Sequence, residues 1–138
     1  TTVGLLMQRF GLAEAITNRA SHGMPIWGTC MGMILLAKTI EDRPNQFTLK
    51  LLDICVKRNA FGAQINSFTT TVHFEPIERT IEAVFIRAPI VSTFGTGVDI
   101  LSTLEDNIVA VRQNRILGTS FHPELSGDAG IHEYFLSM

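Results

Sequence analysis

A cysteine flanked by glycines constrains the fold of this chain more than any other sequence feature. In the segment PIWGTCMGMILLAK, residues 25–38, Cys30 stands between Gly28 and Gly32. The short apolar run before it is typical of a buried strand, and the apolar run after it has the length of a helix. The pattern G-x-C-x-G is a cysteine version of the nucleophile elbow, a sharp turn from strand to helix. It therefore predicts a strand that leads directly into a helix at the edge of a sheet.

The elbow predicts a strained backbone at Cys30. We expect side chains at positions 28 and 32 to collide in so sharp a turn, so that both positions require glycine. The turn would expose the thiol at the amino end of a helix, where the helix dipole and free N–H groups favour the thiolate. The backbone N–H of Met31 would then stabilise an oxyanion. The alternative is that Cys30 is a packed thiol beside ordinary turn glycines.

Cysteine and histidine usage indicates the compartment and argues against a metal site. Cys55 lies within a strand-like run without flanking glycines, which indicates a structural thiol. Two cysteines are too few for a disulfide framework, and free thiols favour a reducing, cytoplasmic location. The histidines show no paired spacing with the cysteines and no C-x-x-C occurs, so we expect no metal site.

Length and charge exclude further classes. A chain of 138 residues with 46% hydrophobic and 17% charged residues fits a single domain over residues 1–138. The net charge of −2, without a basic cluster, argues against nucleic acid as a partner. The longest apolar stretch is far shorter than the ~20 residues of a spanning helix, and no leader like a signal peptide opens the chain. We therefore expect no membrane association.

Hydrophobic periodicity divides the chain into a helical front and a strand-rich middle. Helical spacing predicts helices over 3–10, 12–20, 31–40 and 131–138. Period-two alternation, bounded by turn residues, predicts a strand that ends near residue 28 and strands over 52–57, 65–74, 81–87, 98–104, 108–111 and 116–121. This order predicts an α/β fold whose sheet has an antiparallel extension.

The segment GTSFHPELSG offers a base for the cysteine and a group that orients this base. In extended backbone, His122 and Glu124 point to the same side, and Pro123 stiffens the link between them. The strand-like run before them places the pair at a strand end, where α/β sheets usually carry their chemistry. A surface ion pair is the alternative, and it is our interpretation of the other histidines. Together with the elbow, the pair predicts a Cys30–His122–Glu124 triad.

The chain resembles the glutaminase subunits of pyridoxal 5′-phosphate synthase, the PdxT/SNO family of class I triad glutamine amidotransferases. The resemblance spans the whole chain and lies in four blocks that occur in the family's order: GTCMGMILLAK, RNAFGAQINSF, VFIRAP and GTSFHPEL. The elbow and H-P-E mark the wider amidotransferase class, whereas R-N-A-F-G and F-I-R-A-P point to this family. The resemblance implies a flavodoxin-like three-layer sandwich with a mixed central sheet.

The resemblance also implies an activity. L-glutamine would be hydrolysed to L-glutamate and ammonia through a glutamyl thioester, with Cys30 as nucleophile, His122 as acid and base, and Glu124 as its orienter. Other class I members commonly carry a glutamine shortly after the elbow, whereas this chain has Met33 and Ile34, as the vitamin B6 branch does.

The family pattern further places Arg58 and the Ile86–Arg87 pair at the glutamine site. An arginine can bind the α-carboxylate of glutamine in bidentate fashion. The alternative for each arginine is a surface or fold-supporting ion pair.

The family's partner is a (β/α)8-barrel synthase subunit, which receives the ammonia and builds pyridoxal 5′-phosphate (vitamin B6) from a pentose phosphate and a triose phosphate. We therefore expect this partner, and no cofactor on this chain.

The chain departs from the family pattern in two places. In the family, a first strand and a GGES turn that serves the oxyanion hole precede the TT-x-G helix, whereas this sequence begins at Thr1. We therefore expect an N-terminal strand–helix portion to be missing, and reduced activity from these residues alone. Ala63 stands where the family usually has arginine.

Two other functions remain open from the sequence. A DJ-1/PfpI-type protein also has an elbow cysteine in an α/β sheet, but it lacks the H-P-E block. A non-catalytic docking or regulatory module would keep the fold and its partner surface without turning over glutamine.

Overall fold

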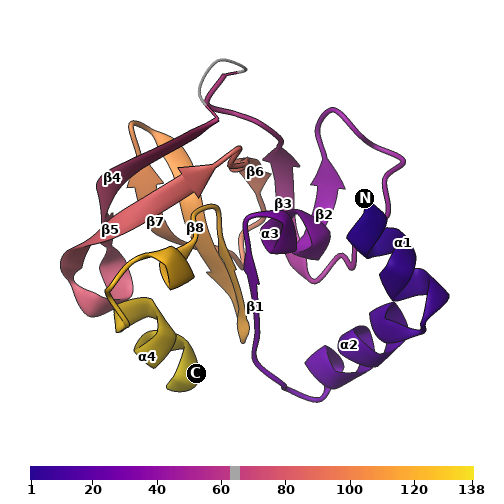
Figure 1. Ribbon diagram of the computed structural model, residues 1–138. Helices are drawn as coiled ribbons and strands as arrows, with labels where there is room; N and C mark the ends of the chain where they lie inside the picture. The colour runs from indigo at the N-terminus through magenta and orange to yellow at the C-terminus, as the bar shows by residue number, and fades with distance from the viewer. Residues whose placement is uncertain (63–65) are drawn as a thin grey trace.

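A mixed sheet with helices around it forms the molecule, which confirms the predicted α/β class. The computed structural model describes residues 1–62 and 66–138 (Figure 1). Ala63 and the first residue of the strand predicted over 65–74 lie outside these described residues. Seven strands form the main sheet in the order β1-β9-β8-β6-β3-β2, with β7 paired to β8, and β4 and β5 form a separate hairpin.

The elements follow the predicted order closely. The strands are β1 Ile26–Thr29, β2 Ala37–Ile40, β3 Leu52–Lys57, β4 Ser67–Phe74, β5 Arg79–Ile86, β6 Ile90–Phe94, β7 Asp99–Leu104, β8 Asn107–Gln113 and β9 Ile116–Thr119. The α-helices are α1 Thr2–Arg9, α2 Leu12–Ser21, α3 Met31–Leu36 and α4 Gly130–Leu136. Within residues 1–62 and 66–138 there are also two 3₁₀ turns, η1 Glu75–Ile77 and η2 Pro123–Leu125.

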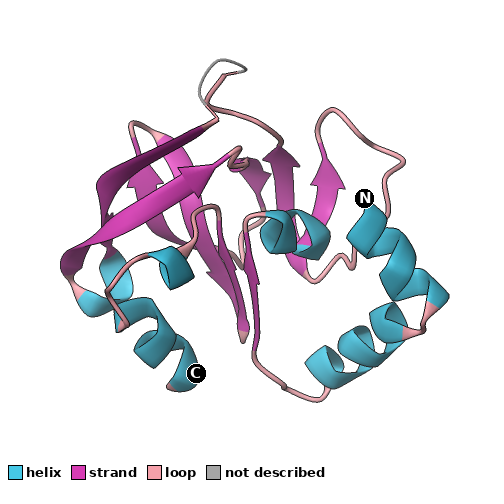
Figure 2. Cartoon of the chain, viewed as in Figure 1, coloured by secondary structure: helices cyan, strands magenta, loops and turns pink. Residues whose placement is uncertain are grey.

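The sheet separates two hydrophobic cores. On one face, α3 packs on β2, β3 and β6 around Met33, Leu52 and Val56, which are fully buried. On the other face, the β4–β5 hairpin and α4 cover the sheet around Phe85 and Phe121. Figure 2 shows the hairpin and α4 together on one side of the molecule, away from α1 and α2. The helix that follows the elbow is thereby packed on the sheet through Met33 and Leu36.

The helix predicted over 31–40 ends at Leu36, and this part of the prediction is wrong. Ala37 has extended backbone (φ −65°, ψ 154°), and β2 begins there and runs parallel to β3. The carbonyl of Leu36 accepts the N–H of Leu51 at 2.9 Å instead of a helical N–H. A continuous apolar run suits a buried helix and a buried strand alike, so its periodicity did not mark the change.

The strand β6 was not predicted. It is short, it follows Pro89, and its residues IVSTF alternate weakly in polarity. Its pairing with β3 on one side and with β8 on the other defines it as a strand. These are contacts between distant segments, to which a local pattern is blind.

No α-helix in residues 1–62 and 66–138 is both long and apolar enough to cross a membrane.

An ion pair fastens the segment before α4 to the start of β5. The Arg79 guanidinium donates to both carboxylate oxygens of Asp128, at 2.5 and 2.8 Å. Asp128 also accepts the N–H of Gly130 at 2.8 Å. The hydrogen bond from Arg79 lowers the pKa of Asp128, with a smaller contribution from the Gly130 N–H. A carboxyl with a lowered pKa stabilises the fold above its ordinary pKa, and this stabilisation is lost as the pH falls through the lowered value.

We expect the Tm of Asp128→Asn to lie below that of the wild type at pH 7. This difference in Tm should shrink as the pH falls below about 4. Asparagine keeps the oxygen that accepts from Gly130 but loses the charge and the second oxygen that accepts from Arg79. Thermal unfolding at pH 7 and at pH 3 measures the effect. Asp53→Asn, which removes the negative charge that lies 3.4 Å from Lys38 Nζ, is the matched control and should change Tm less. An Asp128→Asn deficit of equal size at both pH values would contradict the assignment.

Candidate active site

The elbow has the strained backbone that the sequence predicts. β1 ends at Thr29, α3 begins at Met31, and Cys30 between them has φ 51° and ψ −107°. A positive φ is unusual for a residue with a side chain and is found mostly where surrounding structure enforces it. The geometry turns the chain within one residue and leaves the thiol at the strand end.

The two glycines of the elbow have different roles. A Cβ at position 28 would lie 2.5 Å from the carbonyl carbon and oxygen of Gly32 and 2.7 Å from the Leu36 side chain. The expectation that position 28 requires glycine is thus confirmed. A Cβ at Gly32 would meet nothing within 4 Å, so the same expectation for Gly32 is wrong. The backbone of Gly32 is the obstacle for residue 28, while its own Cα faces open space.

Parallel strand pairing brings the cysteine and histidine segments to one edge of the sheet. β1 lies parallel to β9, with Thr29 opposite Thr119. The N–H of Cys30 continues this ladder and donates to the Thr119 carbonyl at 2.7 Å. His122 follows three residues later, so both side chains leave the sheet at the carboxyl ends of neighbouring strands.

His122 and Glu124 are hydrogen-bonded, although not through the predicted extended backbone. Pro123 begins the 3₁₀ turn η2, and across this turn His122 Nδ1 lies 2.7 Å from Glu124 Oε1. The His122 N–H donates to the Val84 carbonyl of β5 at 2.8 Å. The His122 side chain is 21% exposed and that of Glu124 49%. The carboxylate thus lies behind the imidazole, on its solvent side.

The hairpin strand β5 also touches the thiol. In Figure 1, β5 runs across the molecule toward the region where α3 begins. At its end, the Ile86 carbonyl lies 3.6 Å from the Sγ of Cys30 and accepts the S–H. Ile86 therefore reaches the site through its backbone.

A cleft of about 470 Å³ opens at this edge. It is lined by Thr1, Thr29, Cys30, Met31, Ile34, Arg58, Asn59, Ile86, Arg87 and His122. Every residue that the sequence predicts at the site lies in this lining except Glu124, which bonds to His122. The cleft is large enough for a small, polar substrate.

Burial outweighs the helix end in setting the ionisation of the thiol. Desolvation raises the pKa of Cys30, the Met31 N–H lowers it by a smaller amount, and the charge of Glu124 raises it further. The Met31 N–H at the helix terminus favours the thiolate as predicted, but burial outweighs it and the net shift in the pKa of Cys30 is upward. α3 has only six residues, and a buried thiol loses more hydration than one N–H returns. Attack by this thiol therefore requires a base.

Asn59 and Arg87, two cleft residues with positive φ, lie on loops that are hydrogen-bonded to each other. Asn59 has φ 48° and Arg87 has φ 46°. The Ala60 N–H donates to the Ala88 carbonyl at 3.2 Å, which ties the two loops together. Arg58 donates to Gln46 Oε1 at 3.3 Å. Asn59 lines the cleft and was not predicted, although its place beside Arg58 in RNAFG was a signal.

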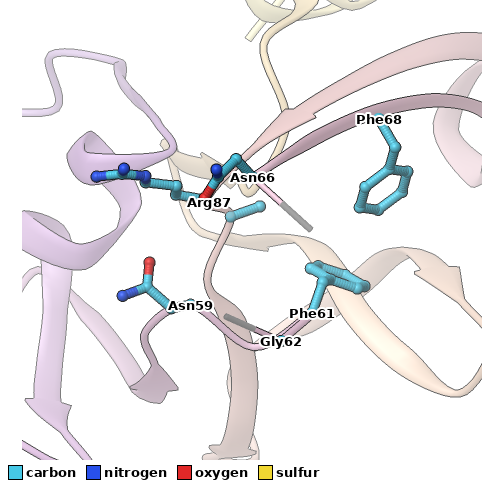
Figure 3. Close-up of a pocket in the computed structure, with 7 residues that line it drawn as sticks. Asn59, Phe61, Gly62, Asn66, Phe68 and Arg87 are labelled. Carbon is cyan, nitrogen blue, oxygen red and sulfur yellow. The ribbon is translucent and has the colours of Figure 1, made fainter. Parts of the chain in front are cut away.

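A second hollow of about 280 Å³ adjoins the cleft and shares Asn59 and Arg87 with it. Figure 3 shows the Arg87 guanidinium and the Asn59 amide on one side of it, and the rings of Phe61 and Phe68 on the other. The two rings meet edge to face, with centroids 5.2 Å apart. The polar side of this hollow is therefore continuous with the cleft.

Among the residues that the structure describes, no three His, Cys, Asp or Glu side chains are grouped as a metal site.

Comparisons with known proteins agree on one family. The model of the SNO glutamine amidotransferase family matches residues 1–138. The chain is 52% identical over 139 residues to "Pyridoxal 5'-phosphate synthase subunit PdxT" of Tropheryma whipplei (strain Twist), covering all of this chain and 73% of that protein. It is 51% identical over 142 residues to the protein of the same name from Herpetosiphon aurantiacus, covering 75% of it.

Solved structures agree. A crystal structure described as a glutamine amidotransferase superposes with a TM-score of 0.94 at 42% identity, over 99% of this chain and 72% of that one. A glutamine amidotransferase from Thermotoga maritima superposes with a TM-score of 0.58 at 18% identity, over 96% of this chain and 53% of that one. The second likeness concerns the fold alone.

The contrast between the two elbow glycines is testable. We expect Gly28→Ala to destabilise the fold by about 1–3 kcal/mol, because the new methyl group overlaps backbone that cannot move aside. Gly32→Ala is the matched control and should be neutral or stabilising by roughly 0.5–1 kcal/mol, since alanine suits a helix better than glycine. Urea unfolding measures both. Equal destabilisation by the two substitutions would contradict the assigned roles.

Proposed function

Because the chain belongs to the SNO glutamine amidotransferase family, we propose that it hydrolyses L-glutamine to L-glutamate and ammonia and supplies the ammonia for vitamin B6 synthesis. One observation carries the chemistry: Cys30 and His122 line the same cleft, and His122 is hydrogen-bonded to Glu124 at 2.7 Å. A thiol, an imidazole and a carboxylate in this order form a nucleophile, its base and the group that orients the base.

In the first half of the reaction, His122 takes the proton of the Cys30 thiol. Glu124 accepts from Nδ1, which leaves Nε2 as the nitrogen that receives this proton. The thiolate attacks the side-chain amide carbon of glutamine, an S–C bond forms, and the carbonyl oxygen becomes an oxyanion. The Met31 N–H at the start of α3 stabilises this oxyanion. A cysteine is mostly protonated at neutral pH, and the raised pKa of Cys30 increases its need for a base.

In the second half, the tetrahedral intermediate collapses. The C–N bond breaks, and His122 returns the proton to the departing nitrogen, which leaves as ammonia. A glutamyl thioester remains on Cys30. Water, deprotonated by His122, attacks the thioester carbon. The C–S bond then breaks and His122 returns the proton to the sulfur, which releases glutamate and the free thiol.

The two arginines of the cleft suit the substrate's α-carboxylate. Arg58 and Arg87 enter from different loops, and a guanidinium binds a carboxylate with two parallel hydrogen bonds. The Oε1 atom of Gln46 accepts a hydrogen bond from the Arg58 guanidinium. With the α-carboxylate bound by the arginines and the side-chain amide at the Cys30 thiol, glutamine would bind in one orientation.

The protein acts as a subunit of a pyridoxal 5′-phosphate synthase, with a synthase subunit as its partner. We propose that this partner is a (β/α)8 barrel that receives the ammonia directly. Delivery between subunits keeps the ammonia from the solvent, where protonation would remove its nucleophilicity.

The sequence left two other functions open, a DJ-1/PfpI-type protein and a non-catalytic docking module. The DJ-1/PfpI-type alternative is not retained, because the family model matches the whole chain and the H-P-E segment forms the His122–Glu124 pair. A docking module would bind the synthase partner without hydrolysing glutamine, and glutamate release by the wild-type complex distinguishes it from an enzyme.

We expect Cys30→Ala to lower glutamate release in the synthase complex by at least about 10³-fold, as loss of a catalytic nucleophile does. A coupled glutamate assay with purified partner measures this. Cys55→Ser is the matched control and should retain activity, because Cys55 lies in β3, outside the cleft lining. Partner binding without wild-type hydrolysis would support the docking module. Labelling of Cys55 instead of Cys30 by an electrophilic glutamine analogue would contradict the assigned nucleophile.

We expect Arg58→Gln and Arg87→Gln each to raise KM for glutamine by about 10- to 100-fold, the loss of one charge-assisted contact. kcat should change little, because the α-carboxylate is bound alike in the ground state and the transition state. Steady-state kinetics of the complex separates the two constants. Arg43→Gln, on an exposed loop, is the control and should leave both constants unchanged. A fall in kcat at constant KM would place these arginines elsewhere in the reaction.

A further inference from the structure

A buried threonine lies between the cysteine and the histidine of the cleft. Thr119 ends β9 and is fully buried. Its carbonyl accepts the Cys30 N–H at 2.7 Å. Its hydroxyl lies 3.0 Å from the Trp27 indole nitrogen and 3.3 Å from the Phe121 carbonyl oxygen. One residue thus contacts both the elbow and the segment that leads to His122.

The chemistry of these partners settles the direction of each hydrogen bond. The indole N–H of Trp27 only donates, so the Thr119 hydroxyl accepts from it. A carbonyl only accepts, so the hydroxyl proton is donated to Phe121. The Thr119 hydroxyl therefore accepts a hydrogen bond from Trp27 and directs its own proton to the Phe121 carbonyl.

The bond to Phe121 fixes the peptide plane that precedes His122. This peptide contains the Phe121 carbonyl and the His122 N–H. The carbonyl is held by the Thr119 hydroxyl, and the N–H is held by the Val84 carbonyl at 2.8 Å. The Phe121 ring is fully buried and packs at 5.5 Å on Phe85. A peptide held at both ends has one orientation, and it sets the direction in which the His122 side chain leaves the backbone.

We propose that Thr119 is a positioning residue for the glutaminase reaction: its carbonyl holds the elbow, its hydroxyl holds the peptide before His122, and together they set the spacing of thiol and imidazole. This inference rests on the proposed function. Thr119 lies outside the cleft lining and acts through Phe121 and Cys30. Misplacement of a catalytic group by about 1 Å costs about 10²-fold in rate, so one buried hydroxyl is sufficient to matter.

The test removes the hydroxyl and keeps the side-chain shape. We expect Thr119→Val in the synthase complex to lower kcat by about 10- to 100-fold and to change KM for glutamine by less than about 3-fold, because the arginines are untouched. Thr119→Ser keeps the hydroxyl and should stay within about 3-fold of wild-type kcat. If Thr119→Val does not fold, Thr119→Ala and Thr119→Ser form a pair that differs only by the hydroxyl.

A matched control separates positioning from stability. Ser102 is also buried, and its hydroxyl donates to a backbone carbonyl, that of His73, at 2.7 Å. Ser102→Ala removes the same kind of hydrogen bond outside the cleft lining. We expect it to lower Tm as Thr119→Val does while kcat stays at the wild-type value.

A second readout does not depend on turnover. The pH dependence of Cys30 alkylation by iodoacetamide, in a Cys55→Ser background, reports how well His122 supports the thiolate. The charged and titratable side chains around Cys30 are His122, Arg58, Arg87 and, behind the imidazole, Glu124. All of them remain in Thr119→Val, so we expect its alkylation midpoint to move to higher pH, because the imidazole is displaced while the thiol stays buried.

The outcomes are distinct. Wild-type kcat and alkylation profile in Thr119→Val, or an equal loss of kcat in Thr119→Ser or Ser102→Ala, would overturn the positioning role. A wild-type complex that releases no glutamate would overturn the proposed function. The alkylation profiles would then still decide whether Thr119 sets the spacing of Cys30 and His122.

Discussion

The parallel pairing of β1 with β9 is the constraint on which the rest of this structure depends. It places Thr29 opposite Thr119 and thereby aligns two segments that are about ninety residues apart in the sequence. The thiol and the imidazole leave the sheet at neighbouring strand ends, where an α/β sheet leaves room for a ligand. A shift of this register by one residue would place the two side chains on opposite faces of the sheet, since side chains alternate along a strand. The chemistry of the cleft thus depends on backbone hydrogen bonds that touch no substrate.

The β4–β5 hairpin supplies the second half of this frame. Its strand β5 holds the backbone of His122 through the Val84 carbonyl and accepts a hydrogen bond from the Cys30 thiol through the Ile86 carbonyl. Packing of Phe85 against Phe121 and the surrounding core keeps the hairpin on the sheet. Fully burying one such phenylalanine contributes roughly 1.5–3 kcal/mol, which exceeds the net contribution of either backbone hydrogen bond. The hydrophobic core on this face therefore stabilises the positions of the polar groups.

The thiol illustrates how opposing effects combine at a helix end. The Met31 N–H favours the thiolate, but desolvation and the charge of Glu124 favour the thiol, and the net shift in the pKa of Cys30 is upward. A protonated resting thiol is less prone to adventitious oxidation and alkylation, since the thiolate is the reactive species. Its activation then depends on His122, and so on the contacts that orient the imidazole. The same burial that protects the thiol makes its partner indispensable.

The sequence by itself determined the elbow, the order of most elements and the reactive residues that gather in the cleft. The elbow is local: the strain at Cys30 and the collision at position 28 follow from backbone sterics within a few residues. Only the tertiary structure decided that the helix after the elbow ends at Leu36, that residues 90–94 form a strand, and that Thr119 joins the two halves of the site. The physical reason is that an apolar run is equally satisfied in a buried helix or a buried strand. Which one forms, and which carbonyl meets which hydroxyl, depends on the distant segments that compete for the same backbone hydrogen bonds.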